Sequence, residues 1–147
     1  MTETLIVSDF KVQRSATTRW SDNDMYGHLN NAVYYQLFDT AINSWIIEEA
    51  GIDPVSAPEL GVVAESGCRY FEQLGFPQPL NVGIRIARLG RSSVTYDLGL
   101  YAKDASDQST VAAQGRWVHV YVDRTTRRPV PVPTNLRNLF TAAVAIS

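Results

Sequence analysis

The sequence predicts an α+β fold in which one long helix packs against a mostly antiparallel sheet. The segment 31–50 carries apolar residues at helical spacing, and the segments after it alternate between apolar and polar residues. Short turn signals separate these alternating segments. One helix followed by consecutive strands is the order expected of an α+β domain.

Length and composition limit the possible functions. The chain has 147 residues, which predicts one domain over 1–147, and its 45% hydrophobic and 19% charged content is typical of a globular protein. The 13 Lys and Arg against 15 Asp and Glu give a net charge of −2, which argues against a broadly basic nucleic-acid binder. No apolar run is long enough to cross a bilayer. We therefore expect neither nucleic acid nor a membrane as a partner.

The N-terminus and the cysteine content favour a reducing compartment. The first ten residues, MTETLIVSDF, lack the basic and apolar regions of a secretory signal. The single cysteine, Cys68, cannot form an internal disulfide, and the two histidines, His28 and His119, form no zinc-type cluster with it. We expect a cytoplasmic protein without a metal site.

The first predicted elements are a strand, a loop and the long helix. Residues 10–20 are rich in β-branched and polar residues, which predicts a strand. Residues 21–31 (SDNDMYGHLNN) are crowded with Asp, Asn and Gly, which predicts a loop ending in a helix start. The helix over 31–50 ends at Gly51. Its apolar face is formed by residues four apart: Val33, Leu37, Ala41 and Trp45.

The rest of the chain reads as strands and a closing helix. Alternation predicts strands over 62–71, 80–89, 93–101 and 111–122, with turns at 90–91 and 123–128. A short helix over 133–144, capped by Thr134 or Asn135, follows.

Both faces of the late strands carry large residues. In the last strand, Val118, Val120 and Val122 share one face, and Trp117, His119 and Tyr121 share the other. One helix covers only one face of a sheet, so a second subunit is expected on the other.

The loop before the helix holds the densest set of chemically capable groups. Asp22 and Asp24 precede the helix, and Asn30 and Asn31 stand at its start. The free N–H groups of a first helical turn carry partial positive charge and can stabilise an oxyanion, while a carboxylate beside them can activate water or attack a carbonyl. The same residues can instead cap the helix and shape a turn. Spacing alone therefore does not identify an enzyme.

Three stretches resemble a known family. The segment TRWSDNDMYGHLNNAVYYQLFDTA closely resembles the hotdog-fold thioesterases of the 4-hydroxybenzoyl-CoA thioesterase-like superfamily. The stretches PLNVGIRIARLGRSSVTYDLGLY and GRWVHVYVDRTTRRPVPVP resemble later strands of that family. The resemblance spans roughly residues 10–140. It implies a hotdog fold, a five-stranded antiparallel sheet wrapped around one long central helix, assembled as a homodimer or a homotetramer.

The resemblance also implies an activity and a site. Asp24 matches the family's catalytic aspartate, Gly27 matches its loop glycine, and the N–H that polarises the thioester carbonyl falls near Asn30 and Asn31. It implies an acyl-CoA thioesterase that releases a free acid and coenzyme A, with Asp24 as general base or nucleophile. Coenzyme A is part of the substrate, and no separate cofactor is expected. Asp22 is expected to be structural.

Other residues could contact the substrate. His28 could orient the substrate or bind the loop backbone, Tyr34 could line the acyl pocket or belong to the core, and Glu65 could reach a partner's site. His119 and Cys68 are expected to be structural. The residues that could contact phosphate, or simply form solvated turns, are Arg91, Ser92, Ser93, Arg124, Arg127 and Arg128.

Two other functions remain open. Hotdog folds also include acyl-thioester hydratases and dehydratases that pair a histidine with an acid, a role that His28 and Asp24 could imitate. A non-catalytic protein could bind acyl-CoA in the same pocket. The product distinguishes the three, because only a thioesterase releases free acid and thiol.

Overall fold

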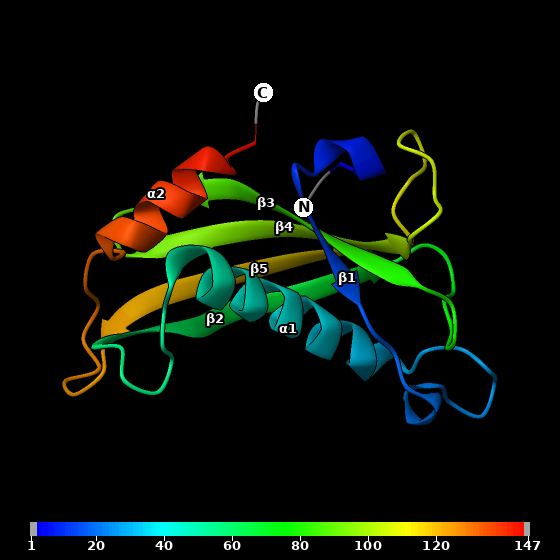
Figure 1. Ribbon diagram of the computed structural model, residues 1–147, viewed down its shortest axis with the longest axis horizontal. Helices are drawn as coiled ribbons and strands as arrows, with labels where there is room; N and C mark the ends of the chain where they lie inside the picture. The colour runs from blue at the N-terminus through cyan, green and yellow to red at the C-terminus, as the bar shows by residue number, and fades with distance from the viewer. Residues whose placement is uncertain (1–2, 146–147) are drawn as a thin grey trace.

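The structure, a computed structural model, describes residues 3–145. Its five strands form one antiparallel sheet in the order β1-β3-β4-β5-β2, and the long helix α1 lies across one face of it (Figure 1). The elements in chain order are η1 (Val7–Asp9), β1 (Val12–Ala16), η2 (Trp20–Asp22), α1 (Asn31–Ala50), β2 (Glu59–Tyr70), β3 (Leu80–Leu89), β4 (Ser93–Ala102), β5 (Ala113–Asp123) and α2 (Thr134–Ala142). The predicted five-stranded antiparallel sheet around one long helix is confirmed.

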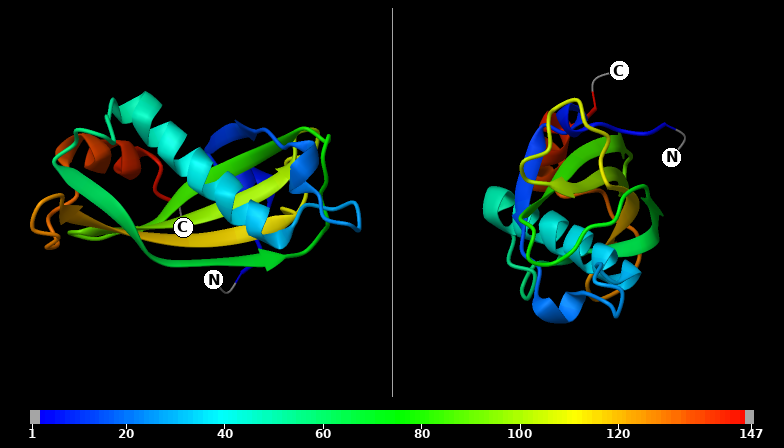
Figure 2. Two further views of the ribbon diagram at one scale, coloured as in Figure 1. Left: turned by 90° about the horizontal axis from the view of Figure 1, so that it is seen from below. Right: turned by 90° about the vertical axis from the view of Figure 1, so that its right-hand side faces the viewer.

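Helix α1 packs closely on the sheet because one strand residue has no side chain. A Cβ on Gly115 of β5 would lie 2.8 Å from the Phe38 ring, so only glycine permits this approach. Phe38 and Ile42 are fully buried, and Gly51 ends the helix in a left-handed conformation with φ 66°. Helix α2 lies on the same side of the sheet, where Phe140 contacts Trp45 of α1 (Figure 2).

The N-terminal segment covers part of the opposite face of the sheet. Along β4, Leu98 and Leu100 belong to the core beneath α1, so the alternate residues Gly99 and Tyr101 face the other way. Phe10 packs there, and a Cβ on Gly83 or Gly99 would lie within 2.8 Å of its ring or Cβ. The N-terminal segment therefore covers part of the face on which the sequence predicted a second subunit.

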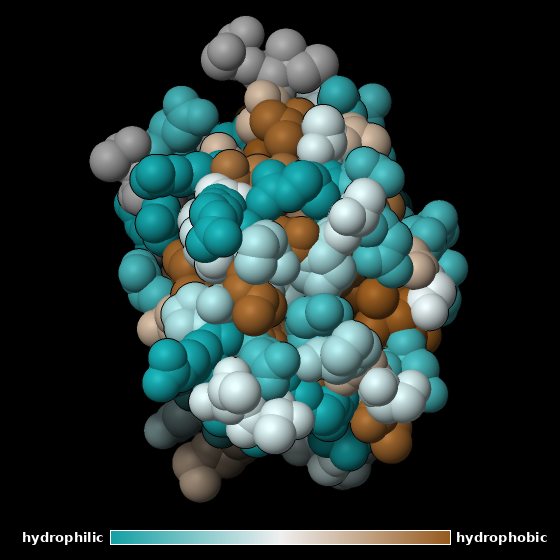
Figure 3. All heavy atoms as spheres, turned by 90° about the vertical axis from the view of Figure 1, so that its left-hand side faces the viewer, coloured by the Kyte–Doolittle hydropathy of each residue, from teal (hydrophilic) through white to brown (hydrophobic). Residues whose placement is uncertain are grey.

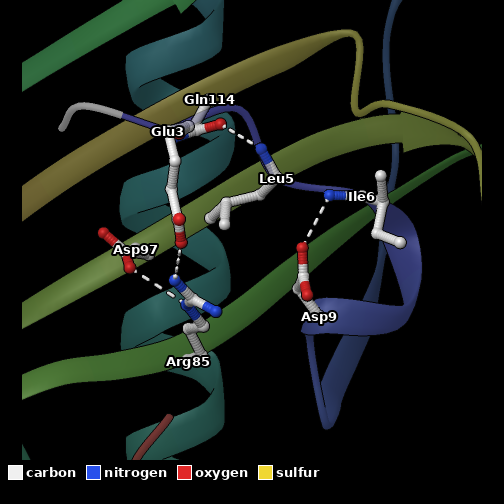
Figure 4. A network of polar contacts seen from close by, with 7 residues as sticks. All are labelled: Glu3, Leu5, Ile6, Asp9, Arg85, Asp97 and Gln114. Atoms are coloured by element: carbon white, nitrogen blue, oxygen red, sulfur yellow. Dashed lines mark hydrogen bonds and ion pairs between the residues drawn. The ribbon is translucent and has the colours of Figure 1, made fainter. Parts of the chain in front are cut away.

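Polar contacts hold the N-terminal segment in place (Figure 4). The side chain of Gln114 accepts a hydrogen bond from the Leu5 N–H and donates one to the Glu3 carbonyl, each at 2.8 Å. Arg85 donates to Asp97 at 3.0 Å and lies 3.7 Å from the Glu3 carboxylate. Because Gln114 is 2% exposed, its amide would be costly to bury without these partners.

Strand β2 forms an edge of the sheet. It pairs only with β5 in the described chain, from Glu59 to Tyr70, with a shift of register between Val63 and Glu65. Val63 in this strand is 49% exposed, which is high for a β-branched residue within a strand. None of the helices within residues 3–145 is long and apolar enough to span a membrane.

Two sequence-based expectations need correction. The first strand, expected over 10–20, is limited to Val12–Ala16, because the chain turns into η2 at Trp20. Helix α2 is preceded by Pro133 at its N-cap rather than by Thr134 or Asn135. The Asn135 amide instead donates to the Ala50 carbonyl at the end of α1, at 3.1 Å.

Candidate active site

A pocket of about 450 Å³ opens where the first turn of α1 meets the end of β2. The loop that precedes α1 forms one side, and the segment that follows β2 forms the other. The lining residues are Asp24, His28, Leu29, Asn31, Tyr34, Tyr70, Phe71, Glu72 and Gln73. The structure thus brings together four of the predicted site residues: Asp24, His28, Asn31 and Tyr34.

Asp24 stands at the start of a tight turn. Its N–H donates to the His28 carbonyl at 2.8 Å, and its carbonyl accepts from the Gly27 N–H at 3.1 Å. Its Oδ1 accepts the backbone N–H of Tyr26 at 2.9 Å and of His28 at 3.4 Å. Oδ2 has no hydrogen-bond partner within residues 3–145. One carboxylate oxygen therefore shapes the loop, and the other remains available for chemistry.

Gly27 allows this turn. Its φ is 82°, in the left-handed region that residues with a Cβ adopt at a cost. A Cβ there would meet nothing within 4 Å. The need for glycine is therefore conformational and does not arise from crowding.

Asp22 has a structural role, as predicted. It is buried, its Oδ2 accepts the Arg19 backbone N–H at 2.8 Å, and its Oδ1 pairs with the Arg19 guanidinium at 2.9 Å. The hydrogen bond from Arg19 lowers the pKa of this carboxyl below its usual value. The Asp22 carbonyl accepts the Asn30 N–H at 2.9 Å, which ties this turn to the helix start.

The segment after β2 supports the loop that carries Asp24. The Leu29 N–H donates to the Leu74 carbonyl at 2.8 Å. The Asn23 side chain accepts from the Phe76 N–H at 2.9 Å and donates to the Phe76 carbonyl at 3.3 Å. Sequence reasoning did not single out Asn23, because its partner is 53 residues away. These contacts hold the loop against a second segment of chain.

The first turn of α1 leaves one backbone N–H free. Asn30 caps the helix, since its Oδ1 accepts the Ala32 N–H at 3.0 Å and its carbonyl accepts the Val33 N–H at 2.9 Å. The N–H of Asn30 itself is bonded to Asp22. Of the four backbone N–H groups of residues 30–33, only that of Asn31 lacks a partner in the described chain. Asn31 also lines the pocket that contains Asp24.

Aromatic residues form the wall opposite the loop. The rings of Tyr34 and Tyr70 meet edge to face with centroids 4.9 Å apart, and the Tyr70 hydroxyl donates to the Asn31 carbonyl at 3.1 Å. Burial raises the pKa of Tyr34, and the nearby charge of Asp24 adds to the shift. Burial also raises the pKa of the Cys68 thiol to about 11, so this cysteine is neutral at pH 7 and fits its predicted structural role.

Sequence reasoning missed the residues that the end of β2 and the segment after it contribute. Tyr70, Phe71, Glu72 and Gln73 line the pocket, but they lie about forty residues from the motif that identified the loop. Only the pairing of β2 with β5 and the course of α1 bring them there. The local pattern contained no signal for this contact.

The predicted phosphate contacts lie at the other end of the molecule. The turn at 124–128 adjoins the start of β2, and the turn at 91–93 lies beside β5 at the same end of the sheet (Figure 1). Asp24 instead shares a pocket with Tyr70, the last residue of β2. Arg124 donates to the backbone carbonyls of Pro54 and Ala57, so it holds a loop. Arg91, Arg127 and Arg128 are exposed, while Ser92 and Ser93 are half-buried. Within one subunit, none of these residues shares the pocket of Asp24.

Glu65 lies between the two ends, near the middle of β2. It is exposed, and its carboxylate is 3.5 Å from the Arg116 guanidinium on β5. No group of three or more His, Cys, Asp or Glu in residues 3–145 is arranged to hold a metal ion.

The family of the chain follows from comparison with known proteins. A family model for the thioesterase-like superfamily matches residues 18–140, which is most of the chain. The protein therefore belongs to this superfamily, as the motif around Asp24 predicted. The match also includes β5 and most of α2.

Solved structures support this assignment. The PA5185 protein from Pseudomonas aeruginosa strain PAO1 is 41% identical and superposes with a TM-score of 0.93 over 99% of each chain. A thioesterase from Thermus thermophilus, solved with coenzyme A and Zn, is 27% identical with a TM-score of 0.74, over 92% of this chain and 95% of that one. A curated relative, YsmA from Bacillus subtilis strain 168, is 25% identical over 88 residues. This match covers 60% of the chain and 59% of that relative.

Replacement of Gly27 by alanine tests the turn at Asp24. We expect Gly27→Ala to lower the free energy of unfolding by about 1 kcal/mol, because alanine adopts a positive φ at a cost. Urea denaturation measures the change. Gly67→Ala is the matched control, since a Cβ there also meets nothing within 4 Å but the backbone φ is not positive. Equal losses in the two variants would contradict the conformational explanation.

Proposed function

We propose that the protein is an acyl-CoA thioesterase whose chemistry takes place at the pocket of Asp24. The observation that carries the proposal is that one pocket is lined by both Asp24, which has a free carboxylate oxygen, and Asn31, whose backbone N–H has no partner within residues 3–145. Hydrolysis of a thioester needs these two functions, a base or nucleophile and a donor for the oxyanion. Membership of the thioesterase-like superfamily supports the same reaction class.

In the proposed reaction, the thioester carbonyl oxygen accepts a hydrogen bond from the Asn31 N–H. Asp24 then removes a proton from a water molecule, whose oxygen attacks the carbonyl carbon. Alternatively, the Asp24 carboxylate attacks first and forms a mixed anhydride that water cleaves. In both routes the carbon–sulfur bond breaks and coenzyme A leaves as a thiolate, which takes up a proton. The thiolate is a good leaving group, so no strong general acid is required.

The remaining pocket residues fit binding roles. Tyr34 and Tyr70 provide an apolar wall for the acyl group. His28 has a backbone N–H bonded to Asp24 and a side chain on the pocket, so it serves to orient the loop and the substrate. Coenzyme A as the leaving group is supported by the Thermus thermophilus thioesterase that was solved with it.

We further propose a homodimer formed by pairing of the β2 edges of two copies. Twelve residues of strand span roughly 36 Å, so the turns at 91–93 and 124–128 are too far to assist Asp24 within one subunit. Antiparallel pairing about the middle of β2, near Glu65, would bring those turns toward the pocket of the other copy. The exposed edge and the exposed Val63 support this arrangement.

Substitution of Asp24 tests the chemistry. With a panel of short, long, branched and aromatic acyl-CoAs, Asp24→Asn and Asp24→Ala are expected to lower kcat by about a hundredfold or more while changing KM little. The reason is that the carboxylate acts on the transition state. Thiol release measures the rate, and Asp104→Asn, an exposed carboxylate in a distant turn, is the matched control. Binding without cleavage by the wild-type protein would refute the hydrolase and favour an acyl-CoA-binding protein.

Substitution of Val63 tests the dimer. Val63→Lys places a charge on the β2 edge and is expected to convert a dimer into a monomer with reduced thioesterase activity. Sedimentation measures the mass. Val55→Lys is the control, because Val55 is 84% exposed in a loop outside the sheet. A wild-type protein that sediments as a fully active monomer would contradict the proposed pairing.

A further inference from the structure

A second, smaller cavity lies at the end of α1 that is far from Asp24. It has a volume of about 130 Å³ and is lined by the second half of α1, the loop after it, the start of β2, the second half of β5 and the start of α2. Apolar side chains, among them Ile46, Leu60 and Leu136, form much of its wall. Figure 3 looks onto this end of the molecule, where polar side chains break up the apolar surface. Nothing in the proposed hydrolysis within one subunit uses this cavity.

His119 is the unusual member of the cavity wall. It is 3% exposed in the middle of β5, and no hydrogen bond to its side chain is found within residues 3–145. Its ring packs edge to face against Tyr96 with centroids 5.3 Å apart. Burial lowers the pKa of His119 to about 4, so the imidazole is neutral at pH 7. A buried neutral imidazole without partners is destabilising, and an occupant that hydrogen-bonds to it would be favoured.

The cavity wall restricts the chemistry of an occupant. A cavity of about 150 Å³ can hold a benzene ring, so this one admits a group of similar or slightly smaller size. Glu59, which also lines it, would repel an anion. A neutral imidazole has one nitrogen that donates and one that accepts, and a hydroxyl group can pair with either.

We propose that this cavity is a binding site for a compact, uncharged and mainly apolar group that carries one hydroxyl. The hydroxyl pairs with the His119 imidazole, and the apolar part packs against Ile46, Leu60 and Leu136. The group can be a free small molecule or the far end of an acyl chain bound at the pocket of the other copy in a dimer. The second source rests on the proposed function, whereas the first does not.

Histidine NMR tests the binding directly, because the chain has only two histidines. His28 reports on the first pocket and His119 on the second, and His28→Gln assigns the two sets of imidazole signals. Phenol and cyclohexanol are expected to shift the His119 signals saturably, at concentrations below about 10 mM, with His28 unaffected. Benzene is expected to bind several-fold more weakly, and benzoate at least about tenfold more weakly. Asp24→Asn is expected to leave these shifts unchanged.

Two variants remove the site in different ways. His119→Phe keeps a ring but removes the hydrogen bond, so phenol and benzene are expected to bind it about equally, as measured by ligand-observed NMR. Leu60 is half-exposed and lines the cavity, so the larger side chain in Leu60→Trp fills the cavity while His119 is retained. Phenol is therefore expected no longer to shift the His119 signals. Urea denaturation of both variants checks that they are folded.

Kinetics distinguish the two sources of the group. Two acyl-CoAs are compared, one whose acyl chain ends in a ring that carries a hydroxyl and one whose terminal ring lacks it. If the cavity holds the acyl end, kcat/KM for the first substrate divided by kcat/KM for the second is expected to be about tenfold lower in His119→Phe than in the wild-type protein. An unchanged ratio, together with the NMR shifts, assigns the site to a free molecule. If no thioester is cleaved at all, the proposed function fails and the NMR result still decides the site. The proposal is overturned if phenol shifts the His119 signals no more than benzene does and the kcat/KM ratio is the same in His119→Phe as in the wild-type protein. The cavity would then hold water only.

Discussion

The rest of the structure depends on the close packing of α1 against the sheet. Gly115 lets Phe38 approach β5, and this contact sets how deeply the helix lies across the sheet. The depth of the helix determines where its first turn meets the end of β2, and therefore where Asn31 stands relative to Tyr70. The opposite end of the same helix closes the smaller cavity around His119. The two ends of α1 thus line two pockets of different chemistry.

The loop before α1 combines two roles that the sequence presented as alternatives. Asn30 caps the helix and Asp22 fixes a turn, as an ordinary helix start requires. The backbone N–H groups of Asn30, Ala32 and Val33 all have partners, whereas that of Asn31 has none within residues 3–145. Asp24 likewise uses one carboxylate oxygen in its turn and retains the other. Among residues 3–145, these contacts leave one backbone N–H and one carboxylate oxygen unpaired, in two residues that line the same pocket.

Local patterns predicted the elements well and the contacts between them poorly. The bounds of α1 and β3 agree with the helical and alternating periodicities, since each segment is long and uniform in pattern. The covering of the outer face by Phe10 could not be predicted, because it depends on the missing side chains of Gly83 and Gly99, far along the chain. Asp24 was found through a resemblance in sequence, whereas Tyr70 reaches the pocket only through strand pairing. The turn at 124–128 could not be placed relative to Asp24 until the direction of β2 was known.

In the proposed mechanism, the Asn31 N–H and the Asp24 carboxylate act on the two ends of one thioester carbonyl, its oxygen and its carbon. The most direct test is a crystal structure with an acyl-CoA analogue in which a CH₂ group replaces the sulfur and the carbonyl is retained. We expect the carbonyl oxygen about 2.7–3.2 Å from the Asn31 nitrogen, with Asp24 in contact with the carbonyl carbon or one water away. A carbonyl bound elsewhere, with the Asn31 N–H still unpaired, would contradict it.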